Sequence, residues 1–276
     1  MTHMLYVVPS LKAKEKLQCE GKAWAESQGF AYVPRGKRTI QDLMDEYGED
    51  FLVYSSRGPQ IDRPEGSHFF SLNMAELRIQ NLRKGQRDHL LEALMGVKEY
   101  DLRPAAAQPP ISVLDCTCGF GADAAVASFG LPAGSRVDAL EVSPLLEAVT
   151  AWGFSHFVHK KDDVTAALRR ISLRCGDYRD YLLSDDGPVY DVLYFDPMFQ
   201  RPVEASCQFQ PVRAIMEHGG LTRDLIERAL QKARRRVVIK ERDFRQLCRD
   251  FPDVALYGGK YSRIGYAVLE CDSWKK

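Results

Sequence analysis

The feature that most constrains the fold is an apolar strand that runs into a turn with two glycines. Ile111 to Leu114 has the composition of a buried strand, and Gly119 and Gly121 follow it in a Gly-x-Gly spacing. Alanine-rich residues then open a helix. Glycine lacks the Cβ that would hold a ligand away from the backbone, and a helix N-terminus presents unpaired N–H groups. The stretch therefore predicts a site for a nucleotide-like cofactor in an α/β fold.

Two cofactor classes fit the glycine turn. Gly119-x-Gly121-x-x-Ala124 satisfies the dinucleotide-binding pattern, and Glu141 follows Gly121 at the distance where either class would place an acceptor for ribose hydroxyls. An NAD-linked oxidoreductase is therefore one hypothesis. Asp115, four residues before the first glycine, favours the other, because the D-x-x-x-G-x-G form is similar to motif I of class I methyltransferases, which bind S-adenosylmethionine (SAM).

A later strand ends in residues that suit chemistry on an amine. Residues 190–195 form a buried-strand pattern and lead into Asp196-Pro197-Met198-Phe199. The exocyclic amine of a base is a poor nucleophile, and Asp196 can accept its N–H bonds so that the lone pair points at an electrophilic methyl group. Pro197 fixes the backbone, and Phe199 can stack on the base. A plain strand end packed by Phe199 is the alternative interpretation.

The order of patterns predicts two domains. Residues 1–75 alternate short strands and helices and form a small α/β domain, whereas residues 76–276 carry the motifs. We expect the second domain to be a Rossmann-like class I methyltransferase fold, an α/β fold with a mostly parallel seven-stranded sheet that ends in an antiparallel hairpin over residues 254–270. A dehydrogenase would continue with parallel units, so the hairpin separates the two hypotheses. Glu141 and Asp196 should then lie at the same edge of the sheet and flank the glycine turn.

Composition limits the partners and the compartment. Lys plus Arg and Asp plus Glu number 38 each, so a nucleic acid must be held by a local basic patch. The seven cysteines are scattered, and no signal peptide or long apolar run is evident, which favours a reduced, cytoplasmic protein without a membrane partner. His156 and His159 have no third ligand in view, so we expect no metal.

Further candidate residues have two interpretations each. Asp177 with Tyr178 could contact an adenine, or Asp177 could simply cap a helix. A cationic run interrupted by Gly85, together with cations near the fifth core strand, could contact phosphate or form a solvated surface. The candidate phosphate contacts are Arg83, Lys84, Arg87, Lys240 and Arg242.

At this point the chain resembles the bacterial RsmJ family, the ribosomal RNA small-subunit methyltransferases that act on a guanine N2 amine. Four stretches carry the resemblance: residues 113–124, Leu140-Glu141-x-x-Pro144, residues 191–199 with Asp-Pro-Met-Phe, and residues 236–240. It implies SAM as cofactor and the ribosomal RNA or the small ribosomal subunit as partner. It also implies a cofactor site at Asp123, with Glu141 on the ribose, Asp177 and Tyr178 near the adenine, and Asp196 at the reacting end.

The chain departs from the family pattern at four places. Ala122 and Val142 stand where the family has Arg, Gln200 replaces a Pro, and residues 203–212 hold only Glu204 as a charge. The backbone and acidic contacts to the cofactor survive these changes, but a less basic loop would hold RNA phosphates less well. A protein that binds SAM or RNA without turnover is therefore a third hypothesis, against which the intact Asp196 argues.

Overall fold

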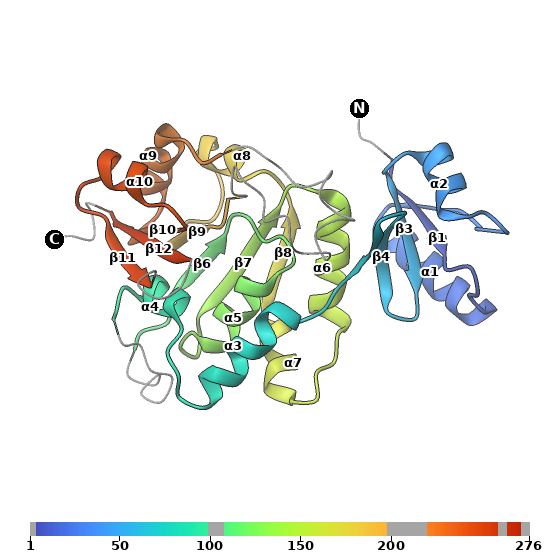
Figure 1. Ribbon diagram of the computed structural model, residues 1–276, viewed down its shortest axis with the longest axis horizontal. Coiled ribbons are helices and arrows are strands. Elements are labelled where there is room, and N and C mark those ends of the chain that lie inside the picture. Colours follow the sequence, from blue (N-terminus) through green and yellow to red (C-terminus); the bar gives the residue numbers. More distant parts are fainter. Residues whose placement is uncertain (1–3, 99–107, 198–219, 259–263, 272–276) are drawn as a thin grey trace. The chain divides into compact units, whose positions relative to one another are not determined.

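The computed structural model describes residues 4–98, 108–197, 220–258 and 264–271, and the chain forms two compact units (Figure 1). Unit 1 comprises residues up to Ser71 together with Ser143–Phe157, and unit 2 begins at Leu72. The expected boundary after residue 75 lies inside a helix that begins at Asn73. The division also differs from the expected one because a helix from the motif-bearing part of the sequence belongs to unit 1.

Unit 1 is a five-stranded sheet in the order β2-β1-β3-β4-β5, in which β2, β1 and β3 are parallel and β3, β4 and β5 antiparallel. Its elements are β1 (Tyr6–Pro9), α1 (Glu15–Ser27), β2 (Ala31–Tyr32), α2 (Ile40–Tyr47), β3 (Phe51–Ser55), β4 (Gly58–Arg63) and β5 (Gly66–Phe69). Val8, Leu43, Phe51 and Val53 are buried together between the sheet and α2. Thr39 and Asp42 form a reciprocal capping box that starts α2.

Helix α6 (Pro144–His156) completes unit 1, although it follows a strand of unit 2 in the sequence. It packs on β4, and its Phe154 meets the ring of Phe70 edge to face at 5.6 Å between centroids. The backbone approaches closely because Gly153 lies against the Phe70 ring, where a Cβ would overlap it. Unit 1 is therefore discontinuous in sequence.

Unit 2 contains a seven-stranded sheet in the order β11-β12-β10-β9-β6-β7-β8. Its strands are β6 (Ser112–Asp115), β7 (Arg136–Glu141), β8 (Ile171–Cys175), β9 (Val192–Phe195), β10 (Arg236–Glu241), β11 (Ala255–Gly258) and β12 (Gly265–Glu270). Strands β8, β7, β6, β9 and β10 are parallel, and β12 is antiparallel to both β10 and β11. The predicted fold class, including the terminal antiparallel hairpin, is confirmed.

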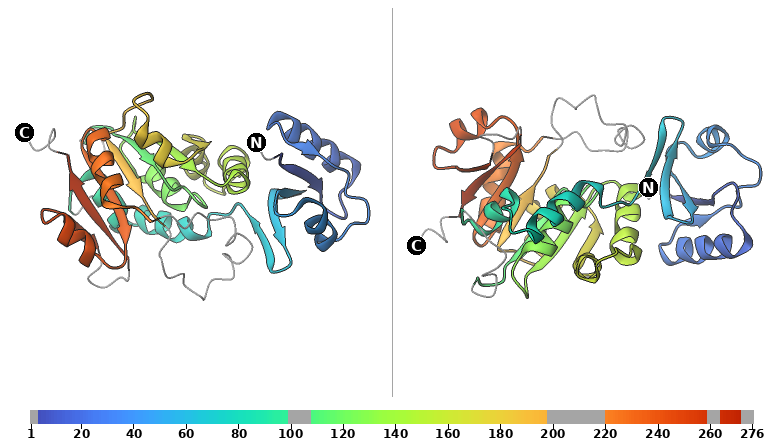
Figure 2. Two further views of the ribbon diagram at one scale, coloured as in Figure 1. Left: turned by 90° about the horizontal axis from the view of Figure 1, so that it is seen from above. Right: turned by 60° about the horizontal axis from the view of Figure 1, so that its bottom comes forward.

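Helices cover both faces of this sheet (Figures 1 and 2). One face carries α3 (Asn73–Arg83), α4 (His89–Met95), α5 (Ala122–Gly130) and α7 (Asp162–Leu168), which contact one another or the sheet. The other face carries α8 (Tyr178–Leu183), α9 (Arg223–Lys232) and α10 (Arg245–Asp250), which pack on a large apolar cluster.

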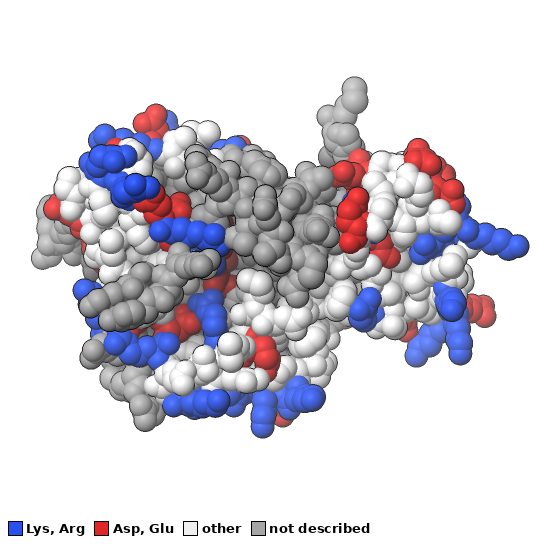
Figure 3. All heavy atoms as spheres, viewed as in Figure 1, with Lys and Arg blue, Asp and Glu red and all other residues white. Residues whose placement is uncertain are grey.

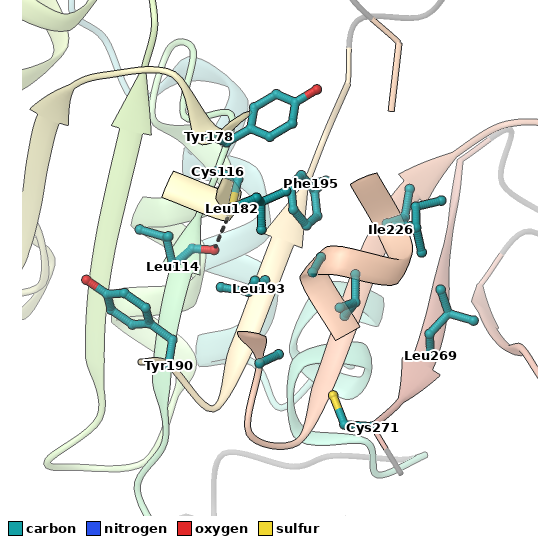
Figure 4. Close-up of a cluster of buried hydrophobic side chains, with 14 of the residues drawn as sticks. Leu114, Cys116, Tyr178, Leu182, Tyr190, Leu193, Phe195, Ile226, Leu269 and Cys271 are labelled. Carbon is teal, nitrogen blue, oxygen red and sulfur yellow. Dashed lines mark hydrogen bonds between the residues drawn. The ribbon is translucent and has the colours of Figure 1, made fainter. Parts of the chain in front are cut away.

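Strand alternation separates the packing face from the polar face of unit 2. Leu193 and Phe195 of β9 point into the apolar cluster beneath α8 and α9, as Figure 4 shows. Side chains alternate along a strand, so Tyr194 points to the opposite face, toward α5, where its hydroxyl meets Asp123. Lys240 of β10 lies on that same polar face. The sheet therefore buries apolar side chains on both faces, Val192 and Val238 among them on the second, and gathers polar groups on that second face near the strand ends.

Candidate active site

The glycine turn joins β6 to α5 and is held to both neighbouring strands. The N–H of Cys116 donates to the carbonyl of Tyr194 at 2.8 Å, and that of Cys118 donates to the carbonyl of Leu140 at 2.9 Å. Gly121, the residue before α5, has φ +74°, a left-handed conformation that suits glycine. Sheet pairing thus fixes the turn above the carboxyl ends of β6, β7 and β9.

Glu141 reaches the turn from the tip of β7. Its carboxylate accepts a hydrogen bond from the N–H of Gly119 at 2.8 Å. Gly119 has φ +54°, and a Cβ there would meet nothing closer than a carbonyl oxygen 4.0 Å away. The backbone of the turn is therefore open to a ligand beside an acidic acceptor. A carboxylate for ribose hydroxyls and a glycine turn at a helix N-terminus fit the donor and acceptor set of SAM.

Asp115 and Asp123 lie on the polar face below the turn, and both are buried. Burial raises the pKa of Asp115 well above its usual value, although its carboxylate accepts an N–H from Thr117 at 3.1 Å. Burial also opposes ionisation of Asp123, but the cations of Lys240 and Arg78 outweigh it and hold the pKa of Asp123 below its usual range. The two neighbouring acids therefore have opposite protonation preferences.

Asp196 stands at the carboxyl end of β9. Its backbone N–H donates to the hydroxyl of Thr117 at 2.7 Å, which ties the strand end to the glycine turn. Its side chain is 29 % exposed, and its carboxylate accepts a hydrogen bond from Nζ of Lys240 at 2.7 Å. Burial raises the pKa of Asp196, the Lys240 cation lowers it, and the Asp123 carboxylate adds to the rise, so the net direction is upward.

The expected common edge of Glu141 and Asp196 is present. Strand β6 lies between β7 and β9, so the two acids end strands on either side of the strand that carries the turn. Each acid contacts the segment 117–119, Glu141 through Gly119 and Asp196 through Thr117. Pro197 follows at intermediate exposure, whereas Phe199 lies outside the described residues.

Asp177 and Tyr178 have structural contacts at the start of α8. The Asp177 side chain accepts from the N–H of Arg179 at 2.8 Å and pairs with the Arg179 guanidinium, so it caps the helix. Tyr178 is buried and meets Phe195 edge to face at 5.4 Å. Both residues lie just beyond the tip of β8, and their expected contact with an adenine stays a prediction.

The candidate phosphate contacts have different surroundings. Arg83 pairs with Asp163, and Nε of Arg87 lies 2.6 Å from the buried carboxylate of Glu92. Lys84 and Arg242 are exposed at the ends of α3 and β10. Lys240 is the exception, because its side chain is only 14 % exposed and its Nζ contacts both Asp123 and Asp196. Lys240 is therefore a largely buried cation of the candidate site and not a surface cation.

Three side chains in this site were not singled out as functional by the sequence patterns. They are Thr117, Arg78 and Tyr194. Tyr194 donates its hydroxyl to Asp123 at 2.7 Å, and Arg78 pairs with both Asp123 and Asp88. A signal for Tyr194 was available, because a residue two positions before Asp196 in a strand faces the same side. Arg78 belongs to the cationic run that Gly85 interrupts, which allowed an anion contact without naming its partner, and no pattern marked Thr117.

Two features that would indicate other kinds of site are missing from the described part of the chain. It holds no group of three or more His, Cys, Asp or Glu residues that could bind a metal ion. None of its helices is both long and apolar enough to cross a membrane.

The fold and the site together define a class I, Rossmann-like methyltransferase that depends on SAM. The order of the sheet, the glycine turn between β6 and α5 and the acid at the tip of β7 are its shared features. Residues 76–264 match the model of a family described as putative SAM-dependent methyltransferases, and the chain belongs to that family. The hypothesis of an NAD-linked oxidoreductase does not agree with this membership or with the terminal hairpin.

Curated relatives extend over most of the chain. YpiP of Bacillus subtilis is 28 % identical over 236 residues, which are 85 % of this chain and 88 % of that protein. Ribosomal RNA small subunit methyltransferase J of Dechloromonas aromatica is 27 % identical over 72 % of this chain and 76 % of its own length. The resemblance to the RsmJ family is thereby confirmed.

A solved structure shares the fold over nearly the whole chain. The SAM-dependent methyltransferase from Neisseria gonorrhoeae superposes with a TM-score of 0.62 at 18 % identity, and the match covers 97 % of this chain and 96 % of that one. At this identity the likeness concerns the fold.

Proposed function

We propose that this methyltransferase modifies the exocyclic N2 amine of a guanine in small-subunit ribosomal RNA. The observation that carries the proposal is the placement of Asp196 at the tip of β9, where its main chain is bonded to the glycine turn. An acceptor at that place suits an amine substrate next to the cofactor. The printed names of several relatives, ribosomal RNA small subunit methyltransferase J, support RNA as the substrate class.

The chemistry requires the chain to orient an amine and to receive a proton. Bound SAM would supply an electrophilic methyl group, to which the amine nitrogen would bond as the methyl–sulfur bond breaks and its electron pair stays on sulfur. Asp196 accepts one N–H of the amine and thereby aims the lone pair, and its carboxylate can take the proton that the nitrogen releases. Pro197 restricts the backbone that follows.

We assign the cofactor grip to Glu141, the turn at Gly119 and Gly121, and residues 177–178. Glu141 is already aligned by its bond to the Gly119 N–H, so its carboxylate is placed to accept ribose hydroxyls. Asp115 and Asp123 lie beneath this site and support it through Thr117 and the cations of the polar face. An RNA substrate agrees with the cytoplasm as the place of action.

Asp196→Asn provides the test. The asparagine keeps the size but replaces one acceptor oxygen by a donor and cannot take a proton, so we expect methyl transfer to fall about 100-fold, the scale of losing one preorganised polar contact at a reacting centre. SAM affinity should change little. Purified protein, labelled SAM and unmodified small-subunit RNA or subunits give the rate, and mass spectrometry of digested RNA identifies N2-methylguanosine.

Asp180→Asn is the matched control, since Asp180 is an exposed acid on α8. Its rate should equal that of the unaltered protein. SAM binding without N2-methylguanosine in either RNA or subunits would refute the substrate and favour the non-catalytic hypothesis. Methylation at full rate by the Asp196→Asn variant would refute the role of the acid while leaving the substrate intact.

A further inference from the structure

A chain of side chains with alternating charge crosses the polar face of unit 2 and ends at Asp196. Asp88 pairs with Arg78 at 2.8 Å, Arg78 pairs with Asp123, Asp123 lies 2.8 Å from Nζ of Lys240, and that Nζ lies 2.7 Å from Asp196. The five groups come from the α3–α4 segment, α5, β9 and β10. Each interior member therefore has an opposite charge on both sides.

Lys240 holds the central cation of this chain. Buried lysines need partners, because an isolated ammonium loses several kcal/mol of hydration when it leaves water. Here the first effect of burial is to lower the pKa of Lys240, but the Asp123 and Asp196 carboxylates reverse it and the net direction is upward. Lys240 is thus a cation between two carboxylates, of which Asp123 is buried and Asp196 is partly exposed.

Asp123 has hydrogen-bond donors other than Lys240, so it does not need the whole Lys240 ammonium group. The Asp123 carboxylate also accepts the guanidinium of Arg78 and the hydroxyl of Tyr194 at 2.7 Å. Arg78 in turn lies between two acids, Asp88 and Asp123. Because other donors serve Asp123, Lys240 can place one of its three N–H donors on Asp196 without leaving Asp123 short.

Asp196 needs such a partner because its other charged neighbours are acids. The titratable groups near Asp196 come from four elements. They are Lys240 and Glu241 of β10, Asp123 of α5, Asp115 of β6 and Tyr194 of β9. Lys240 is the cation among them. Without it, burial and the remaining carboxylates would favour a protonated Asp196, which would donate to an amine rather than accept from it.

We propose that Lys240 is a positioning residue for methyl transfer: it holds the Asp196 carboxylate in its ionised form and fixes one oxygen, leaving the other to accept the N–H of the substrate amine. The inference rests on the proposed function, because it assumes that Asp196 meets an amine. It replaces the expected phosphate contact at Lys240. The observations that carry it are the two acids beside the ammonium and the Tyr194 hydroxyl that donates to one of them, Asp123.

Lys240→Met tests the proposal. Lys240→Arg is the conservative variant, and Lys232→Met is the control. Methionine keeps the length but removes the charge, whereas arginine keeps the charge. Lys232 is the matched control, since it is a partly buried lysine on α9 whose Nζ donates to the carbonyl of Tyr181 at 2.6 Å, away from Asp196. Two measurements are made on each variant. One is the pH profile of kcat/KM, and the other is a ¹³C NMR titration of the labelled Asp196 carboxyl, which needs no RNA.

We expect the acid limb of the Lys240→Met profile to move to higher pH by about one unit or more, which is about a tenfold loss at pH values below it. The NMR titration of Asp196 should move in the same direction. The sign follows because the ionised acid is active, so activity disappears as pH falls through the pKa of Asp196. Lys240→Arg should restore most of the position of the limb, and Lys232→Met should leave it unchanged.

The outcomes separate this inference from the proposed function. An unchanged Asp196 titration in Lys240→Met overturns the role of Lys240, whatever the RNA assay gives. A uniform loss of rate without a shifted limb also overturns it, since that is what a purely structural lysine predicts. If the titration moves but the unaltered protein methylates no RNA, the electrostatic role stands and the substrate assignment fails.

Discussion

Glu141 is the proposed acceptor for the ribose of the cofactor, and strand geometry fixes its position. It ends β7 in the buried part of the sheet, and its carboxylate is already engaged by the N–H of Gly119 at 2.8 Å. A side chain held in one orientation before the ligand arrives loses less entropy on binding. The glycine turn and the acid therefore act as one preorganised unit.

This residue gives a prediction about affinity. In Glu141→Gln the neutral amide retains one acceptor oxygen, so the Gly119 N–H and a ribose hydroxyl both lose their charged partner and one of them loses its acceptor. We expect the Kd for SAM to rise about 10- to 100-fold, the equivalent of one hydrogen bond to a charged group. Calorimetry measures the affinity, and Glu227→Gln on α9 is the control because the Glu227 side chain is 46 % exposed and pairs with Arg223. An unchanged Kd would remove Glu141 from the cofactor site.

For single residues, the sequence predicted where a side chain lies in the fold better than it predicted which other side chains that residue contacts. Asp196 and Lys240 end neighbouring parallel strands, and the pairing of Ile239 with Phe195 brings both to the same edge. Their proximity followed in principle from the strand order, but the order itself depends on which strands pair across long sequence distances. Arg78 reaches Asp123 from a helix 45 positions earlier, and no local pattern encodes that contact.

At the scale of elements, local chemistry predicted most boundaries in unit 2. The long helical pattern after residue 72 breaks between α3 and α4 at Gly85, whose φ of +75° suits glycine. Thr222 caps α9, since its hydroxyl accepts the N–H of Leu225. Caps and glycines mark ends reliably because they satisfy or release backbone groups within a few residues.

The end of α4 yields a prediction about stability. Gly96 has φ +66°, and a Cβ there would overlap the guanidinium of Arg236, which donates to the carbonyl of Leu94 at 3.2 Å. Gly96→Ala combines left-handed strain with overpacking, so we expect a loss of about 2–5 kcal/mol in unfolding free energy. Denaturant unfolding followed by fluorescence measures it.

Gly134→Ala separates the two causes. Gly134 also has a positive φ, +87°, but its nearest contact would be an ordinary 3.6 Å to Pro110. Only the backbone strain of about 1–2 kcal/mol should appear there. Equal losses at both glycines would mean that the Arg236 contact contributes nothing to the cost at Gly96.

At the scale of the whole molecule, charge is distributed in agreement with its zero net value. Both signs of charge occur on the described surface in view, and Lys and Arg side chains gather along its lower edge (Figure 3). If the substrate is RNA, as proposed, a zero net charge gives it little long-range attraction, and binding would depend on local contacts.

The division into units was the part of the architecture that the sequence predicted least well. Residues 1–75 are expected from the sequence to form an independent domain, because their strands and helices follow one another without interruption. Helix α6 was assigned by chain position to the following domain. Its membership in unit 1 depends on the Gly153–Phe70 approach and on Trp152, whose ring lies against Gly58. Such contacts join residues about 80–95 positions apart, and no hydrophobic periodicity in either segment indicates them.

A fragment of residues 1–75 tests this discontinuous unit. The fragment lacks α6, so β4 and Phe70 lose the helix surface that packs on them. We therefore expect no cooperative thermal transition in circular dichroism. Phe154→Ala in the full chain removes part of the same packing without cutting the chain, and truncating so buried a ring should destabilise unit 1 by about 3–5 kcal/mol. Hydrogen exchange should then speed up in β4 more than in β6 or β9. Leu11→Ala is the control, since Leu11 is an exposed apolar residue of the same unit. A fragment that melts sharply on its own would show that α6 is dispensable and that the simpler boundary is correct.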